Sequence, residues 1–186
     1  TRFVDSHRFW CPEGIMIGDN VSIQKDAFFM LPYGNFAGKP RIKIGNGCDI
    51  GYRCIITAVN DITIEDKVLI ANNVQIMDHN HAYEKIGVPI MDQGVVVKEN
   101  GEVVVGYGSW LGNNVVIAGT VHIGRGCVIG ANSVVTSDIP DYCVAVGSPA
   151  KIVKGFSYKT GKWCRLKNEE ERIAFLKERK KSKPIL

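Results

Sequence analysis

Three side chains that can accept or orient a proton, those of Asp78, His79 and His81, fall within four positions of this chain. The only other histidines are His7 and His122. A neutral imidazole is well suited to take a proton near neutral pH, and a neighbouring carboxylate can fix its tautomer. The cluster therefore predicts a general base, while a polar loop with surface histidines is the non-catalytic interpretation.

A six-residue period defines the elements that must position this cluster. From Val105 an apolar side chain recurs at Leu111, Ile117, Ile123, Ile129 and Val135. Four residues after each of the first five come the small side chains Ser109, Val115, Val121, Cys127 and Ser133. A helix repeats apolar residues every three or four positions and a strand every two, so a period of six indicates a short strand plus a turn, repeated.

The same period occurs upstream. It runs through Ile17 and Ile23, then Ile44, Ile50 and Ile56, and, after a slip of two residues, Ile64, Ile70 and Ile76. About five coils of a solenoid result. In this register Cys48, Cys54 and Cys127 take the small inner position, and the six cysteines form no CxxC pair. We therefore expect free thiols in a reducing compartment.

The period breaks between Ile76 and Val105, which are 29 residues apart, or four hexads plus five. An insertion of this kind must leave the solenoid as a loop, at about residues 78–103, and such loops often carry function. Asn100-Gly101 stands between two valine runs, which predicts a β-hairpin with a type I′ turn. The histidine cluster lies at the start of this loop.

The runs "IGNGCDIGYRCI", "IEDKVLIANNVQIMDHNH" and "VGYGSWLGNNVVIAGTVHIGRGCVIGANSVVTSDIP" resemble the hexapeptide-repeat acyltransferases. The resemblance covers about residues 15–156 and implies an all-β, left-handed parallel β-helix. The closing "VGSPAKIVKGF" resembles the branch that acetylates sugars and surface polysaccharides, which includes galactoside and maltose acetyltransferases. We expect a β-helix domain over 1–156 and, over 157–186, a C-terminal extension with a basic helix.

The resemblance implies which histidine is the base. Aligned without gaps from "VLIANNV", the catalytic histidine of the galactoside and maltose acetyltransferases falls on His81, with His79 two residues earlier as the other candidate. The imidazole would take the proton from an acceptor hydroxyl as its oxygen attacks the thioester of acetyl-CoA. Asp78 and Glu84 are candidates to hold the ring or to bind the acceptor.

The resemblance also implies a binding site for coenzyme A. Its expected residues are Trp110, Asn113, Gly130, Ala131, Thr136, Ser137, Lys151 and Lys154. Trp110 precedes an inward residue and should therefore stand on an outer face. Lys151 and Lys154 replace the arginines that the family more often has for the ribose 3′-phosphate, which keeps the charge but loses the bidentate fork. Ser137 replaces a common lysine.

A metal site is the competing interpretation, because a His-x-His pair can place two ligands on one ion and some relatives with this fold are zinc carbonic anhydrases. His122 lies 41 residues after His81, between the inward-facing Val121 and Ile123, so it should point outward. The third histidine that such a site needs is therefore missing from the pattern, and we expect no metal.

Charge divides the chain unevenly. Residues 151–186 carry twelve Lys and Arg against four Glu, whereas residues 1–150 carry eleven basic against fifteen acidic side chains. Asn168, three following glutamates and the terminal lysines and arginines predict a capped helix, with Ile173 and Leu176 as its apolar stripe. The helix is too weakly apolar for more than peripheral membrane contact, and no nucleic-acid motif accompanies the basic tail.

These observations predict a cytoplasmic, acetyl-CoA-dependent O-acetyltransferase. It would act on a sugar or glycan hydroxyl by direct transfer, as a homotrimer with active sites between subunits, as the family implies. One alternative is an amino-sugar N-acetyltransferase. A second is a metal-binding or scaffolding β-helix without acyl transfer.

Overall fold

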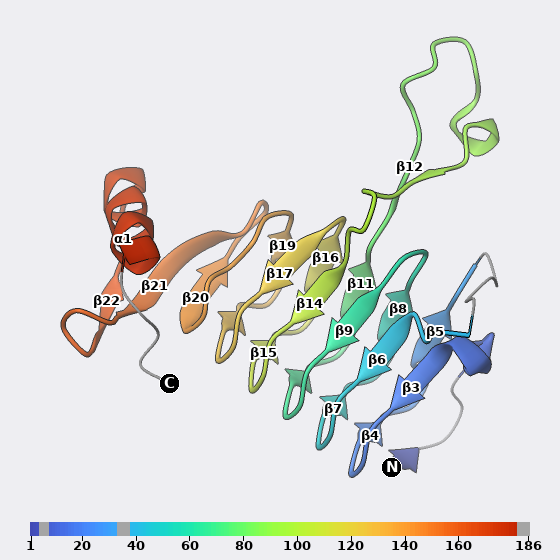
Figure 1. The fold of residues 1–186 in the computed structure, drawn as a ribbon, viewed down its shortest axis with the longest axis horizontal. Helices are drawn as coiled ribbons and strands as arrows, with labels where there is room; N and C mark the ends of the chain where they lie inside the picture. The colour runs from blue at the N-terminus through green and yellow to red at the C-terminus, as the bar shows by residue number, and fades with distance from the viewer. Residues whose placement is uncertain (4–7, 33–37, 182–186) are drawn as a thin grey trace.

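The computed structural model describes residues 1–3, 8–32 and 38–181 and shows a parallel β-helix (Figure 1). Three sheets, here called A, B and C, run along the length of the molecule, and the chain passes from sheet C to A to B in each coil. Strands of adjacent coils pair in parallel. The six-residue period is thereby confirmed, because each hexad supplies one short strand and one turn.

The strands of each sheet follow in spatial order, within the described residues. Sheet A contains β1 (Arg2–Phe3), β4 (Ser22–Ile23), β7 (Asp49–Ile50), β10 (Leu69–Ile70), β15 (Trp110–Leu111), β18 (Val128–Ile129), β20 (Cys143–Val146), β21 (Lys151–Ser157) and β22 (Lys162–Arg165). Sheet B contains β2 (Arg8–Trp10), β5 (Phe28–Met30), β8 (Ile55–Thr57), β11 (Gln75–Met77), β16 (Val116–Ala118) and β19 (Val134–Val135). Sheet C contains β3 (Ile15–Ile17), β6 (Ile42–Ile44), β9 (Ile62–Ile64), β14 (Val103–Val105) and β17 (Val121–Ile123).

The core is a set of stacked aliphatic columns inside the coil. The apolar residues of the period from Ile23 to Val135 are at most 1% exposed, and Ile17 at the N-terminal end is partly buried. Each side chain lies on its equivalent in the next coil, as Ile50 does on Ile70 and Ile70 on Leu111. Full burial of such a side chain contributes about 1.5–3 kcal/mol, so this register is strongly selected.

The small inner positions hold cysteines, as predicted. Cys48, Cys54 and Cys127 are buried, and all six cysteines of the chain are free. The thiol of Cys54 donates to the carbonyl of Ala71 (3.1 Å), and that of Cys127 to the carbonyl of Pro140 (3.0 Å). Burial raises the pKa of Cys54 and of Cys127 to about 11. These thiols therefore pack as small apolar groups and are not expected to react as nucleophiles.

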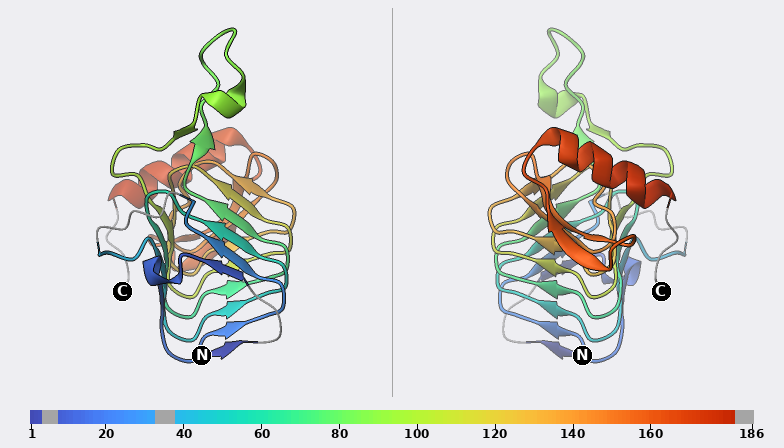
Figure 2. Two further views of the ribbon diagram at one scale, coloured as in Figure 1. Left: turned by 90° about the vertical axis from the view of Figure 1, so that its right-hand side faces the viewer. Right: turned by 90° about the vertical axis from the view of Figure 1, so that its left-hand side faces the viewer.

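The expected loop leaves the β-helix after β11 and returns at β14, and it projects far from the coil (Figures 1 and 2). It contains β12 (Asn80–His81), a 3₁₀ turn at Ile90–Asp92 and β13 (Val95–Val96). The Gln93 side chain accepts from the Lys85 N–H (3.0 Å) and donates to the Val88 carbonyl (2.8 Å). Apolar side chains of this loop are highly exposed, with Ile86 at 97% and Met91 at 91%.

The predicted hairpin at Asn100-Gly101 is wrong. Asn100 has the positive φ of 53° that a type I′ turn needs, but the valine runs on either side do not pair with each other. Val103 pairs instead with Ile62 in sheet C, and the antiparallel pair joins β12 to β13. A two-stranded hairpin is only marginally stable in water, whereas pairing in sheet C buries Val103 and Val105 fully in the core. This burial favours the pairing in sheet C over the hairpin.

At the C-terminal end, sheet A continues past the coil through β20, β21 and β22, which pair antiparallel. The helix α1 (Glu169–Lys181) packs on β21 (Figure 2). The Asn168 side chain accepts from the N–H of Glu171 (2.9 Å), so the predicted N-cap is confirmed. The expected domain boundary at 156/157 falls inside β21, and that division stays a prediction. No helix in the described part of the chain could span a membrane.

The apolar stripe of α1 differs from the prediction. Phe175 is its buried residue, Leu176 is partly buried, and Ile173 is 45% exposed. The ring of Phe175 lies directly on Gly155 of β21, where any Cβ atom would collide with it. The absence of a side chain at Gly155 lets an aromatic ring reach the strand, and this sets which face of the helix is buried.

Candidate active site

The Asp78–His81 segment leaves the coil at the corner between sheets B and C, directly after β11. Asp78 itself still belongs to the coil, because its carboxylate is completely buried. One carboxylate oxygen accepts from the N–H of Val59 (2.9 Å) and the other from the N–H of Asn60 (2.6 Å). Val59 and Asn60 lie at the same corner one coil earlier, so this carboxylate ties the exit of the loop to the solenoid.

His79 is held by the same carboxylate. Its Nδ1 atom lies 2.9 Å from Asp78 Oδ1, and its side chain is 13% exposed. Because both oxygens already accept backbone N–H groups, we assign the hydrogen to Nδ1, which leaves Nε2 as the acceptor of the neutral ring. Within the described residues, Nε2 has no partner. This is the arrangement of a base whose tautomer is fixed by a carboxylate.

His81 lies on the strand β12 and is exposed. Its backbone is fixed opposite Val95 of β13, and Ala82 donates to the carbonyl of Gly94 (3.0 Å). Its imidazole makes no polar contact with another described residue. Asp78 and Glu84 were expected as possible partners of His81, but Asp78 orients His79 instead, and Glu84 is exposed on the loop.

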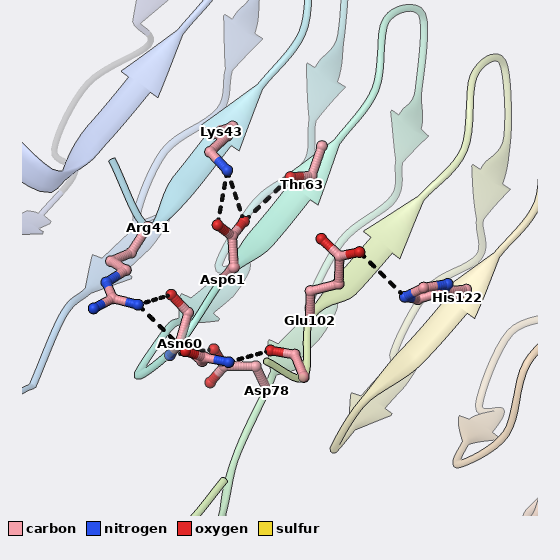
Figure 3. Close-up of polar contacts among 9 residues, drawn as sticks. Arg41, Lys43, Asn60, Asp61, Thr63, Asp78, Glu102 and His122 are labelled. Atoms are coloured by element: carbon pink, nitrogen blue, oxygen red, sulfur yellow. Dashed lines mark hydrogen bonds and ion pairs between the residues drawn. The ribbon is translucent and has the colours of Figure 1, made fainter. Parts of the chain in front are cut away.

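A second layer of polar side chains lies behind this corner (Figure 3). The guanidinium of Arg41 donates to the main-chain carbonyl of Asn60 (2.9 Å), and the Asn60 amide donates to the carbonyl of Gly101, where the loop returns. Neither Arg41 nor Asn60 was predicted from the sequence. The slip of two residues between Ile56 and Ile64 was the available signal, because the enlarged turn that it produces contains Asn60.

His122 points outward from sheet C, as expected. Its Nε2 atom lies 3.5 Å from a carboxylate oxygen of Glu102 on the exposed side of the sheet (Figure 3). On the same side, the Lys43 ammonium contacts the carboxylate of Asp61 (2.7 Å). Across the part of the chain that the structure describes, no three His, Cys, Asp or Glu side chains are grouped as metal ligands.

The residues expected to bind coenzyme A fall into three groups. Trp110 is 47% exposed on the outer face of sheet A, and Asn113, Gly130 and Ala131 follow at the corner between sheets A and B. Lys151 and Lys154 lie on β21, which extends sheet A, and Val128 and Val144 connect Trp110 to Lys154 in register. Thr136 and Ser137 lie at the corner between sheets B and C.

Three of these residues also make contacts within the chain. The Asn113 side chain accepts from the N–H of Asn72 (3.0 Å), which links adjacent coils. A Cβ atom at Gly130 would lie 2.7 Å from Cγ1 of Val146, so a larger residue there would force the Val146 side chain to move. Lys154 Nζ lies 5.3 Å from the centre of the Trp163 ring, a cation–π contact that the sequence did not indicate.

The two halves of the expected site do not meet within one chain. In a three-sided coil the corner between sheets B and C lies opposite sheet A. Trp110 and the histidines therefore lie on opposite sides of the coil. Within one subunit, Asp78, His79 and His81 share a corner of the coil with Thr136 and Ser137, which lie two coils further on, whereas Trp110 lies on sheet A.

A β-helix of hexapeptides with a histidine-bearing loop at one corner defines the hexapeptide-repeat class of transferases. The family described as bacterial transferase hexapeptide (six repeats) matches residues 102–137, and the hexapeptide repeat of succinyl-transferase matches residues 41–77. The chain is 42% identical over 158 residues to a putative lipopolysaccharide biosynthesis O-acetyl transferase, WbbJ, of Escherichia coli, covering 80% of this chain and 76% of that protein.

A probable acetyltransferase of Mycobacterium tuberculosis is 40% identical over 113 residues, which is 61% of this chain but only 37% of that protein. A galactoside acetyltransferase solved in complex with coenzyme A superposes with a TM-score of 0.64 at 29% identity, covering 78% of this chain and 67% of that one. An N-acyltransferase of Bacillus cereus has a TM-score of 0.67 at 22% identity, covering 92% and 84%, and shares the fold.

The chain therefore belongs to the bacterial hexapeptide-repeat transferases and is an enzyme of their acetyltransferase class. Its β-helix is the left-handed one of that family, as the resemblance implied.

Proposed function

We propose that this chain transfers an acetyl group from acetyl-CoA to a hydroxyl group of a sugar or glycan in surface polysaccharide or related biosynthesis. The observation that carries the proposal is the pair of imidazoles at the root of the extruded loop, one of them fixed by a buried carboxylate. The likeness to a putative lipopolysaccharide O-acetyl transferase over most of its length supports the choice of acceptor.

His81 is the general base in this proposal. Its exposed imidazole takes the proton of the acceptor hydroxyl while the hydroxyl oxygen bonds to the thioester carbon. The C–S bond then breaks, the proton passes to the departing sulfur, and coenzyme A leaves as the thiol. A general base of this kind contributes about 10²- to 10⁴-fold to the rate.

His79 is the second candidate for the same role. The observation in its favour is the Asp78 contact, which fixes the tautomer with Nε2 as the acceptor. The alignment with the family favours His81, whereas the contact with the Asp78 carboxylate favours His79. The test below must therefore treat the two residues separately.

The donor would lie along sheet A against Trp110, with Asn113, Gly130 and Ala131 beside it and the lysines 151 and 154 near its phosphates. Because Trp110 lies opposite the histidine corner, we propose a homotrimer in which the histidines of one subunit face the donor groove of the next. Thr136 and Ser137, at the histidine corner, would then contact the donor of the neighbouring groove. Six free thiols accord with a cytoplasmic location.

The experiment measures release of coenzyme A from acetyl-CoA with a panel of sugars and amino sugars. His81→Ala, His79→Ala and His122→Ala are compared, with His122→Ala as the control because that histidine lies on the exposed face of sheet C. We expect His81→Ala to lower turnover on hydroxyl acceptors by about 10²-fold or more and His122→Ala to leave it unchanged.

Each other outcome has a defined meaning. A larger loss for His79→Ala assigns the base to His79. Turnover of amines alone replaces the proposal with N-acetylation, and an isolated acetyl-enzyme that reacts on with the acceptor overturns direct transfer. No turnover together with no binding of coenzyme A favours a scaffolding role.

A further inference from the structure

Asn60 is bonded to both roots of the extruded loop. At the exit, its backbone N–H donates to the buried carboxylate of Asp78 (2.6 Å). At the return, its side-chain amide donates to the carbonyl of Gly101. A single residue of the preceding coil thereby fixes the two points between which about twenty residues leave the solenoid.

Asn60 is in turn held by Arg41 from one coil further back. The Arg41 guanidinium donates to the main-chain carbonyl of Asn60 (2.9 Å) and to its side-chain oxygen (3.3 Å). The second bond orients the Asn60 amide so that its nitrogen faces Gly101 (Figure 3). The polar chain therefore runs from Arg41 through Asn60 and Asp78 to the imidazole of His79.

The return root is built to receive this contact. Gly101 is buried, and a Cβ atom there would collide with the hydroxyl of Thr120. The strands β12 and β13 pair over only two residues each, and an isolated pair of that length is marginal in water. The loop therefore depends on its roots for a fixed position.

We infer that Asn60 is a positioning residue for the histidine segment. It acts through Asp78 and Gly101, and Arg41 holds it in the required orientation. The expected effect on turnover rests on the proposed acetyl transfer, whereas the positioning of the histidine segment does not. A displacement of about 1 Å in a catalytic group can cost as much as 10²-fold in rate, so a fixed root has a direct consequence for turnover.

The test compares Asn60→Ala with Asn46→Ala. Asn46 also bonds across coils through its side chain, accepting from the N–H of Asp19 (2.7 Å), but it lies at the corner between sheets C and A, away from the loop. Asn60→Asp is a second variant, which keeps the size of the side chain but cannot donate to Gly101. Three quantities are measured: the imidazole NMR signals of His79 and His81, kcat against KM for acetyl-CoA, and the thermal unfolding midpoint.

We expect both Asn60 variants to shift or broaden the imidazole signals and to lower kcat about tenfold, with KM for acetyl-CoA changed less than about twofold. Asn46→Ala should lower the thermal unfolding midpoint about as much as the Asn60 variants do. Its imidazole signals and its kcat should nevertheless stay those of the wild type. The inference is overturned if the Asn60 variants match Asn46→Ala in signals and kcat. If the wild type has no turnover, the proposed function fails, and the NMR comparison still decides the positioning role.

Discussion

At the scale of single residues, the two histidines have different surroundings although they are two positions apart. His79 is mostly buried against a carboxylate that belongs to the core, and His81 is exposed on a strand of the loop. Both residue types and their spacing were visible in the sequence. Their division into a fixed and an open imidazole was not, because it depends on the backbone N–H groups of Val59 and Asn60 in another coil.

The cysteines give a prediction at this scale. Burial raises the pKa of Cys48 above its usual range, that of Cys54 and Cys127 to about 11, and that of Cys143 to about 12. Because the thiolate is the reactive form, these four should be inert to a disulfide reagent at pH 8.

Cys11 and Cys164 are the partly exposed pair, and we expect these two to be modified rapidly in the native protein. All six should react in guanidinium chloride. Rapid modification of more than two thiols in the native state would show that the inner positions open readily.

Folding keeps the buried thiols protonated, so their contribution to stability is complete below the ordinary thiol pKa and declines as the pH rises toward 11.

At the scale of elements, the strands were predictable and their partners at the insertion were not. The stacked aliphatic side chains recur from coil to coil, so the period in the sequence maps directly onto the sheets. At Asn100-Gly101 a local turn signal competed with burial of Val103 and Val105 between neighbouring coils, and burial prevailed. The apolar stripe of α1 was misassigned for a similar reason, because the space over Gly155 decides which side chain is buried.

The contact between Gly155 and Phe175 gives the prediction at this scale. Gly155→Ala places a methyl group inside the Phe175 ring contact, so we expect a loss of about 1–3 kcal/mol in the free energy of unfolding. The measurement is denaturant unfolding in a double-mutant cycle.

Phe175→Ala removes the colliding ring and serves as the background. In that background Gly155→Ala should cost less than about 0.5 kcal/mol. Equal costs in the two backgrounds would mean that the helix does not pack on β21 through this contact.

At the scale of the whole molecule, the residues proposed to bind the donor and those proposed as the base lie on opposite sides of one subunit. The loop that holds the histidines also exposes Ile86 and Met91 almost completely, and burial of such side chains by a partner would be favourable. The proposed trimer accounts for both observations, since a neighbouring subunit would cover the loop and supply the donor groove.

This proposal gives a prediction for assembly. Light scattering should give three times the chain mass of 20.5 kDa for the wild type. A variant with Ile86→Asp and Met91→Asp should dissociate and lose most of its activity while its circular dichroism stays that of a β-helix. Ile173→Asp, which changes an exposed residue on α1, is the matched control and should remain trimeric. A monomeric wild type, or a fully trimeric and active loop variant, would contradict the proposal.

The sequence by itself determined the coil, because a strict period of six leaves each apolar side chain one place to be buried and each turn one place to form. It also located the loop and the cluster of Asp78, His79 and His81. Only the tertiary structure decided that Asp78 serves His79, that Arg41 and Asn60 hold both roots of the loop, and that Trp110 lies on the opposite side. These contacts join residues from different coils, and a local pattern cannot specify which polar groups meet when coils stack.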